Sequence, residues 1–188
     1  MGNMSTFIQK LSIILLGGYI ASNNMIQAQV QNLYPNPPDK IISTIVQQGT
    51  VMTGIGNIDV PLLRTTIIVS GSNDNETLKE IRGKLVNTSS MNDVKRIKAY
   101  LAPDTYDLNI QNATLLGNAT VNSTGNFNIK LNNLCHLDNG NHYIWITADI
   151  SDMAKEGNTV DLQINSYLRE NGNTIYENNG NPEYFATI

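Results

Sequence analysis

Hydrophobic and polar residues alternate along most of the chain beyond residue 40. The segment 125–131 is the clearest case, because Phe127, Ile129 and Leu131 are apolar and the residues between them are polar. Successive side chains of a strand point to opposite faces of a sheet, so this period of two predicts strands with one buried face. We expect such strands at 60–71, 77–87, 93–102, 113–121, 125–131, 142–150 and 159–167.

Short turn segments rich in glycine and asparagine separate the expected strands. The sequence NGN at 171–173 is typical of a hairpin turn. One helical turn is expected near 151–156, with Ser151 or Asp152 as its cap and Gly157 as its end. Several short strands with so little helix favour an all-β fold, an antiparallel β-sandwich of the jelly-roll or immunoglobulin-like type.

The strand expected at 142–150 contains the only tryptophan of the chain, Trp145. Aliphatic residues form one face of this strand, and Tyr143, Trp145 and Thr147 lie on the other. A loop such as 102–112 covers this second face in one interpretation, which agrees with the tendency of large aromatic side chains to bury their area. In the other interpretation the face is open, and these three side chains form a ligand-binding platform on which sugar rings stack.

The first 28 residues have the plan of a secretory signal peptide. Lys10 is their only charge, an apolar run occupies 11–21, and the small residue Ala28 stands at the expected cleavage point, with Ala21 as a second option. The run is shorter than the roughly 20 apolar residues that span a bilayer. We therefore expect export to the periplasm, the cell surface or the medium, and no membrane span in the mature chain. The expected parts are a signal peptide at 1–28, a flexible lead-in at 29–40 and a single β-sandwich domain at 41–188.

The composition limits the partners of the chain. Its 188 residues have a formal net charge of −4, and only 15% of them are charged. Nucleic-acid binding is not expected, because it requires a basic surface. A neutral polar surface suits hydroxyl-rich ligands, although it equally suits a protein without a ligand. Cys135 is the only cysteine, so a disulfide within the chain and a cysteine zinc site are both excluded.

The sequence contains no catalytic constellation that we can identify. It lacks an H-E-x-x-H motif, a glycine-rich phosphate loop with its lysine, and a G-x-S-x-G elbow. Asp149 and Asp152 could be proposed as paired carboxylates, but capping of the expected helical turn explains them. We therefore expect no enzyme activity, no metal site and no cofactor.

A longer pattern begins at the turn 139–141. It reads G-N-H-Y-x-W-I-T, then D-I-S, then A-x-x-G-N-x-V-D, and it resembles the N-terminal domain that precedes the catalytic propeller in bacterial BNR-repeat sialidases. The resemblance extends over roughly 60–167. The matching residues are Gly140, Asn141, Tyr143, Trp145, Ile146, Thr147, Asp149, Ile150, Ser151, Ala154, Gly157, Asn158, Val160 and Asp161.

The resemblance implies a β-sandwich, export and a non-catalytic accessory role in carbohydrate binding. It does not imply sialidase activity, because the chain has none of the S-x-D-x-G-x-x-W boxes of the propeller. The expected function is that of an accessory module that binds a glycan or assists a partner glycosidase. The alternative is a structural or adhesive cell-surface protein that uses its sandwich for contacts with other proteins, for example through an exposed sheet edge.

Overall fold

The computed structural model describes residues 40–46, 51–70, 76–103, 107–132, 135–177, 180 and 185–188, and for 40–46 it describes the backbone only. The expected signal peptide at 1–28 and lead-in at 29–40 fall outside these residues, apart from Lys40. The strands are β1 (Lys40–Val46), β2 (Val51–Met52), β3 (Val60–Ser70), β4 (Glu76–Val86), β5 (Val94–Ala102), β6 (Thr114–Ala119), β7 (Asn126–Lys130), β8 (His136–Leu137), β9 (Gly140–Ile150), β10 (Thr159–Arg169), β11 (Thr174–Tyr176) and β12 (Ala186–Thr187), with one 3-10 turn, η1 (Met91–Asp93).

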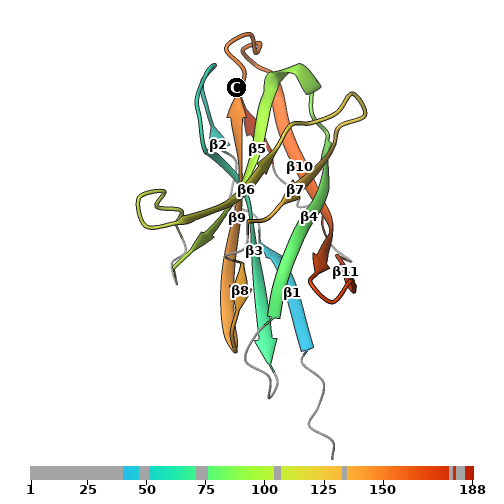
Figure 1. Cartoon of the computed structure of the whole chain (residues 1–188). Coiled ribbons are helices and arrows are strands. Elements are labelled where there is room, and N and C mark those ends of the chain that lie inside the picture. Colours follow the sequence, from blue (N-terminus) through green and yellow to red (C-terminus); the bar gives the residue numbers. More distant parts are fainter. Residues whose placement is uncertain are drawn as a thin grey trace, which may run out of the picture. The chain divides into compact units, whose positions relative to one another are not determined.

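These strands form the two sheets of a sandwich (Figure 1). The five-stranded sheet has the order β1-β3-β9-β5-β6, and all of its neighbouring strands are antiparallel. The second sheet has the order β2-β12-β10-β4-β7, with β11 paired to β10 and β8 paired to β4. Only β2 and β12 run parallel among the described pairs of this sheet. The expected antiparallel β-sandwich is confirmed.

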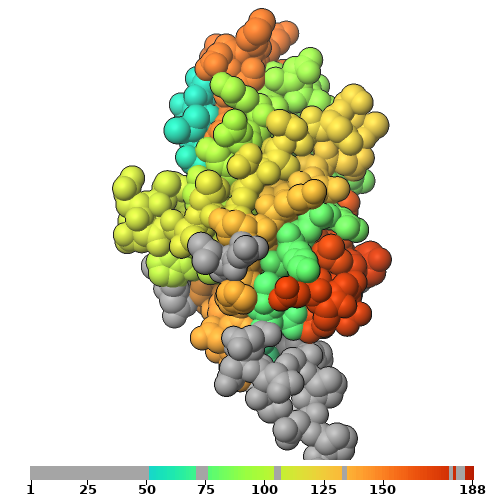
Figure 2. Space-filling model, in the orientation of Figure 1, coloured from blue at the N-terminus to red at the C-terminus, as the bar shows by residue number. Residues whose placement is uncertain are grey.

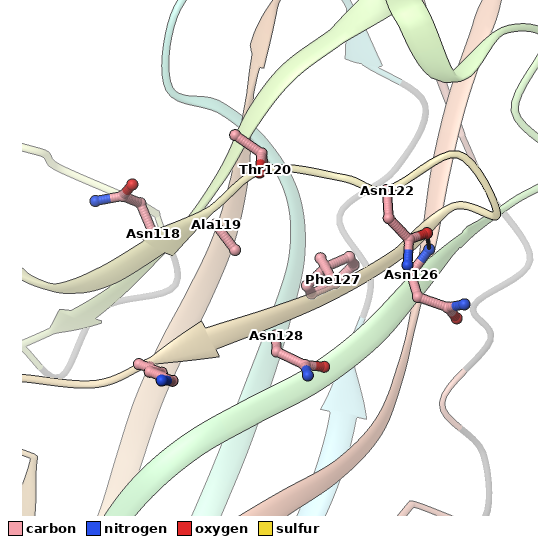
Figure 3. Close-up of a pocket in the computed structure, with 8 residues that line it drawn as sticks. Asn118, Ala119, Thr120, Asn122, Asn126, Phe127 and Asn128 are labelled. Atoms are coloured by element: carbon pink, nitrogen blue, oxygen red, sulfur yellow. Dashed lines mark hydrogen bonds between the residues drawn. The ribbon is translucent and has the colours of Figure 1, made fainter.

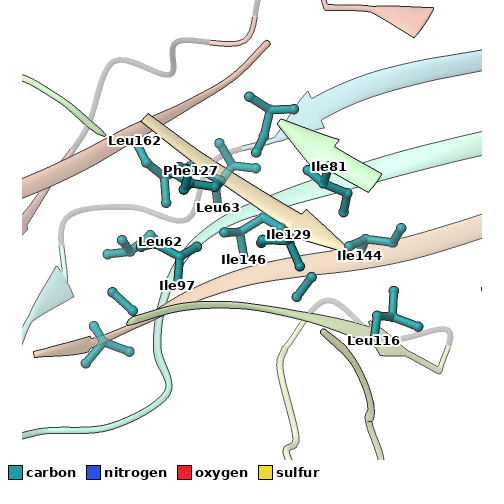
Figure 4. Close-up of a cluster of buried hydrophobic side chains, with 14 of the residues drawn as sticks. Leu62, Leu63, Ile81, Ile97, Leu116, Phe127, Ile129, Ile144, Ile146 and Leu162 are labelled. Carbon is teal, nitrogen blue, oxygen red and sulfur yellow. The ribbon is translucent and has the colours of Figure 1, made fainter. Parts of the chain in front are cut away.

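The core lies between the two sheets, and the alternation of the sequence explains it (Figure 4). Ile144 and Ile146 of β9 point inward from the five-stranded sheet, and Phe127 and Ile129 of β7 point inward from the other. All four side chains are at most 2% exposed. The faces expected for 142–150 and 125–131 are therefore confirmed.

One strand departs from strict alternation. Leu78 and Ile81 of β4 are both buried, although their positions are three apart and alternation alone would place them on opposite faces. The pairing of β4 with β10 shifts between Glu80 and Leu78, which marks a β-bulge. The bulge turns Leu78 back toward the core.

The prediction of a helical turn near 151–156 is wrong. The segment forms two successive turns, in which Ala154 N donates to Ser151 O (3.1 Å) and Asn158 N donates to Lys155 O (3.1 Å). Gly157 has the positive φ (83°) that was expected, but it is the third residue of the second turn and does not end a helix. Serine caps and left-handed glycines serve both kinds of structure, so the sequence signal did not distinguish them.

The hairpin expected at 171–173 is present between β10 and β11. Arg169 N donates to Asn173 O (2.9 Å) across the turn, and Gly172 has a φ of 85°. In the part of the chain that the structure describes, no helix has the length and apolar character needed to cross a membrane.

Candidate functional site

The residues expected to form a ligand-binding platform lie on the outer face of β9, away from the core. Trp145 and Thr147 are 0% exposed, and Tyr143 is half-buried. In the sheet register Trp145 stands between Arg64 of β3 and Tyr100 of β5. The structure therefore brings the three side chains to one face, as expected, but two of them have no access to solvent.

The segment after β5 covers this face. Trp145, Tyr100 and Ala102 form a small second apolar cluster, and Leu108 and Ile110 pack against it together with a neighbouring alanine. The covered interpretation is confirmed, and the open aromatic platform is wrong, because the ring of Trp145 offers no surface to a sugar. Ligand binding by Tyr143, Trp145 and Thr147 stays a prediction, and it requires the segment 107–113 to move.

Arg64 completes this second cluster. Its guanidinium carbon lies 5.5 Å from the ring centre of Tyr143 and 5.7 Å from that of Trp145, which is the distance range of cation–π contacts. Within the described residues Trp145 Nε1 and Thr147 Oγ1 have no hydrogen-bond partner, and both atoms are buried. Such atoms cost about 1–3 kcal/mol each. The outer face of β9 is therefore closely packed, but two of its buried polar atoms lack a hydrogen bond among the described residues.

A charged cluster holds the chain segment before β3 against the same sheet. Lys98 Nζ of β5 lies 2.8 Å from Asp59 Oδ1 and 2.7 Å from Asp149 Oδ1. Tyr100 donates its hydroxyl proton to Asp59 Oδ1 (2.8 Å), and Asp59 N donates to Asp149 Oδ1 (3.1 Å). Asp59 adopts a φ of 56°, a conformation that needs such support in a residue other than glycine. The groups of the cluster are engaged with one another, so we assign it a structural role.

The cluster also shifts the proton affinities of its members. Burial acts to lower the pKa of Lys98, but hydrogen bonds to Asp149 and Asp59 outweigh this effect and raise the pKa above its ordinary value. Burial, and then the hydrogen bond to Asp59, raise the pKa of Tyr100. Both groups therefore keep their protons more strongly in the folded chain than in the unfolded chain.

A groove of about 410 Å³ opens elsewhere, between β6 and β7 (Figure 3). Its volume is within the range of roughly 300–1,000 Å³ that is common for small-molecule sites. Polar side chains dominate its lining. The lining residues are Asn118, Ala119, Thr120, Asn122, Asn126, Phe127, Asn128 and Lys130.

The topology explains why a groove forms here. β6 is an edge strand of the five-stranded sheet, and β7 is an edge strand of the other sheet. Backbone hydrogen bonds join the two segments at both ends, from Asn132 N to Leu116 O (2.7 Å) and from Asn122 N to Asn126 O (2.9 Å). No ladder pairs β6 with β7 in the described residues. The strands are therefore held together at two points and stand apart between them.

The turn that links the two strands uses part of the polar lining. Asn122 Oδ1 accepts from the backbone N–H groups of Thr124 (3.0 Å) and Asn126 (2.9 Å). By contrast, Asn118 and Asn128 are exposed, and their amides have no hydrogen-bond partner among the described residues. A carboxamide offers two donors and one acceptor oxygen, so these two side chains can pair with hydroxyl groups of a ligand.

The groove lining offers carboxamide, hydroxyl and ammonium groups for hydrogen bonding. Its lining contains no carboxylate, histidine, cysteine or serine. Phe127 is 2% exposed and belongs to the core, so the groove also lacks a stacking surface of the kind expected on β9. Among the described residues no group of three or more histidine, cysteine or acidic side chains is placed to hold a metal ion.

Sequence reasoning missed this groove. The alternation of 125–131 correctly placed Asn126 and Asn128 on an outward face, and the richness in asparagine was visible. The other wall, however, comes from a different sheet. Which strand lies beside β7 at the edge of the sandwich depends on the order of the strands in the two sheets. The local alternation of hydrophobic and polar residues does not predict this order.

Comparisons with known proteins identify a similar fold. No family model matches the chain, and no curated protein matches its sequence. Among solved structures, the chain is similar to one described as Hadza microbial sialidase Hz136, with a TM-score of 0.56 and 11% sequence identity. The similarity covers 77% of this chain and 30% of that one. At this identity it shows the fold alone, so the β-sandwich is similar in fold to a part of a sialidase.

Proposed function

We propose that this chain is an exported, non-catalytic module that binds carbohydrate and assists a glycosidase. The binding part of the proposal is carried by one observation, the asparagine-lined groove between β6 and β7. Sugar hydroxyls act as donors and acceptors at the same time, and a carboxamide answers both functions. Asn118 and Asn128, whose amides have no hydrogen-bond partner among the described residues, line a space of small-molecule size there.

The accessory part of the proposal has separate support. The fold is similar to 30% of a sialidase chain, which leaves most of that enzyme outside the similarity. The sequence resembles a sialidase N-terminal domain at 139–161 and lacks the boxes of the catalytic propeller. The export part rests on the charge and hydropathy plan of residues 1–28.

A glycan-array screen of the full chain tests the proposal, with neutral, sialylated and galactose-ended structures on the array. We expect saturable binding to a restricted set of glycans. The double variant Asn118→Ala/Asn128→Ala should bind the selected glycan about tenfold more weakly, because each neutral hydrogen bond contributes about 0.5–1.5 kcal/mol.

Asn92→Ala is the matched control, because Asn92 is an exposed asparagine in η1, outside the groove lining. It should leave both the affinity and the melting temperature unchanged. A folded protein that binds no glycan would overturn the proposal. The structural or adhesive role would then be the better explanation of the sandwich.

A further inference from the structure

The strand next to the groove carries an excess of positive charge. β4 pairs with β7, and on the outward face of this pair Lys84 stands opposite Asn126, Arg82 opposite Asn128, and Glu80 opposite Lys130. These side chains alternate with core residues, so they share one face of the sheet. Three cations and one acid give this strip a formal charge of +2, whereas the whole chain has −4.

Two of the cations in the strip are available to a ligand. Arg82 is engaged, because its Nε pairs with the carboxylate of Glu80. Lys84 is half-buried and Lys130 is exposed, and neither has an ion-pair partner in the part of the chain that the structure describes. A half-buried lysine without an acid is a favourable place for an external anion.

The neighbouring strand β10 does not neutralise these lysines. It presents Gln163 opposite Lys84. The only acid within β10 is Asp161, which is 5% exposed and accepts a hydrogen bond from Asn87 Nδ2 (3.2 Å). Within the described residues, Lys84 and Lys130 are therefore left without a carboxylate partner.

The strip is continuous with the groove. Asn126, Asn128 and Lys130 belong to both, because they line the groove and pair with β4. Figure 3 shows β4 running beside β7 on the side opposite β6, and Figure 2 shows the β6–β7 segment and β4 on the same face. A molecule in the groove thus lies next to the lysines.

We propose that the groove takes an acidic saccharide, whose hydroxyls pair with Asn118 and Asn128 and whose carboxylate or sulfate groups lie against Lys84 and Lys130. This inference rests on the proposed function and specifies its ligand. Amides alone do not discriminate between neutral and acidic sugars. The lysines supply the discrimination, because an anion gains from them and a neutral sugar does not.

Calorimetric titration of the full chain with three oligosaccharides of equal length tests the proposal: a neutral one, a uronic-acid one and a sulfated one. We expect at least one acidic oligosaccharide to bind about tenfold or more tightly than the neutral one at low salt. This preference should shrink as salt is raised to about 0.5 M, because exposed charges are then screened.

Charge-removing variants locate the discrimination. Lys84→Gln/Lys130→Gln should weaken binding of the acidic oligosaccharide about tenfold. Lys84→Gln alone, at a residue outside the groove lining, should weaken binding of the acidic oligosaccharide and leave binding of the neutral one within twofold. Lys155→Gln is the matched control, because Lys155 is an exposed lysine in the turns after β9, and it should change neither affinity.

The two levels of the proposal fail in different ways. Equal affinity for neutral and acidic oligosaccharides, or an acidic preference unaffected by Lys84→Gln/Lys130→Gln, would overturn the acidic ligand and leave carbohydrate binding intact. Equally tight binding of inorganic polyphosphate would also overturn it, since that result indicates an unspecific anion surface. Binding of no saccharide at all would overturn the proposed function itself.

Discussion

At the scale of single residues, Trp145 has the packing of a structural residue. It is 0% exposed and contacts the cluster on the outer face of the five-stranded sheet. We predict that Trp145→Ala lowers the free energy of unfolding by about 3–5 kcal/mol, as expected for a buried aromatic truncation. Denaturant unfolding followed by circular dichroism measures this loss.

The native protein provides a second measurement on the same residue. Trp145 is the only tryptophan, so its fluorescence is unambiguous. We expect blue-shifted emission that acrylamide quenches weakly. Emission near that of free tryptophan, with efficient quenching, would show that the segment 107–113 does not cover the ring in solution.

Lys98 is the second residue with a large expected effect. Lys98→Met removes the cation that lies between Asp59 and Asp149 and leaves two carboxylates facing each other. We predict a loss of about 2–3 kcal/mol in unfolding free energy, measured by denaturant unfolding at pH 7. In the control Lys95→Met, a pair with Asp152 at 3.7 Å is lost, and its exposed side chains imply less than about 1 kcal/mol. Equal losses in the two variants would contradict the structural role of the cluster.

The same cluster predicts an alkaline loss of stability. The pKa of Lys98 is raised above 10.5 in the folded chain, so its contribution is complete below that pH and is lost as the pH rises through the folded value. The raised pKa of Tyr100 acts in the same direction, because the unfolded phenol releases its proton first. We expect unfolding free energy to fall above about pH 10, and to fall less in Lys98→Met. A pH series of denaturant titrations measures the difference, and identical slopes would contradict the assignment.

At the scale of strands, the contact between β6 and β7 at one end of the groove depends on a glycine. A Cβ added to Gly117 would lie 2.3 Å from Lys130 O, a distance that only a backbone shift can relieve. We predict that Gly117→Ala separates the two strands, lowers the melting temperature and weakens ligand binding in the groove. Gly54→Ala is the control, because its Cβ would meet only the side chain of Asn57, at 3.3 Å. Unchanged stability and binding in Gly117→Ala would show that β6 and β7 do not approach as described.

The strands also show which features of the fold the sequence pattern predicts and which it does not. Alternation predicts the core-facing residues of β7 and β9, because aliphatic or aromatic residues occupy every second position in both strands. The opposite face is exposed in β7, whereas in β9 it is buried from Trp145 onward. It fails at Leu78, where a bulge in β4 changes the phase, and at 151–158, where serine and glycine signals fit turns as well as a helix. At Leu78 the deciding contact comes from β10, which is distant in the sequence, whereas at 151–158 local hydrogen bonds close two turns in place of a helix.

At the scale of the whole molecule, the sandwich brings together two edge strands that the sequence pattern treats as independent. The groove exists only because β6 and β7 belong to different sheets. The asparagines that line it were visible in the sequence, but the sequence pattern did not show that they line one groove. For the outer face of β9, the sequence predicted which aromatic residues lie together. It did not decide whether another segment covers them.

The reactivity of the Cys135 thiol shows whether the core of the sandwich is closed to solvent. Cys135 is 0% exposed, and burial raises the pKa of its thiol to about 12. We predict that an aromatic disulfide reagent at pH 8 labels the native protein negligibly and labels it rapidly once denaturant unfolds it. Absorbance at the released thiolate band measures the rate. Fast labelling without denaturant would contradict a closed core around Cys135.

The measurement that tests the central claim most directly compares two variants with the saccharide selected on the array. Asn118→Ala/Asn128→Ala changes the groove, and Trp145→Phe changes the outer face of β9 while keeping an aromatic ring. We predict that the groove variant loses about tenfold in affinity and that Trp145→Phe binds like the unchanged protein. Full affinity in the groove variant with loss in Trp145→Phe would contradict the assignment and move the site to β9.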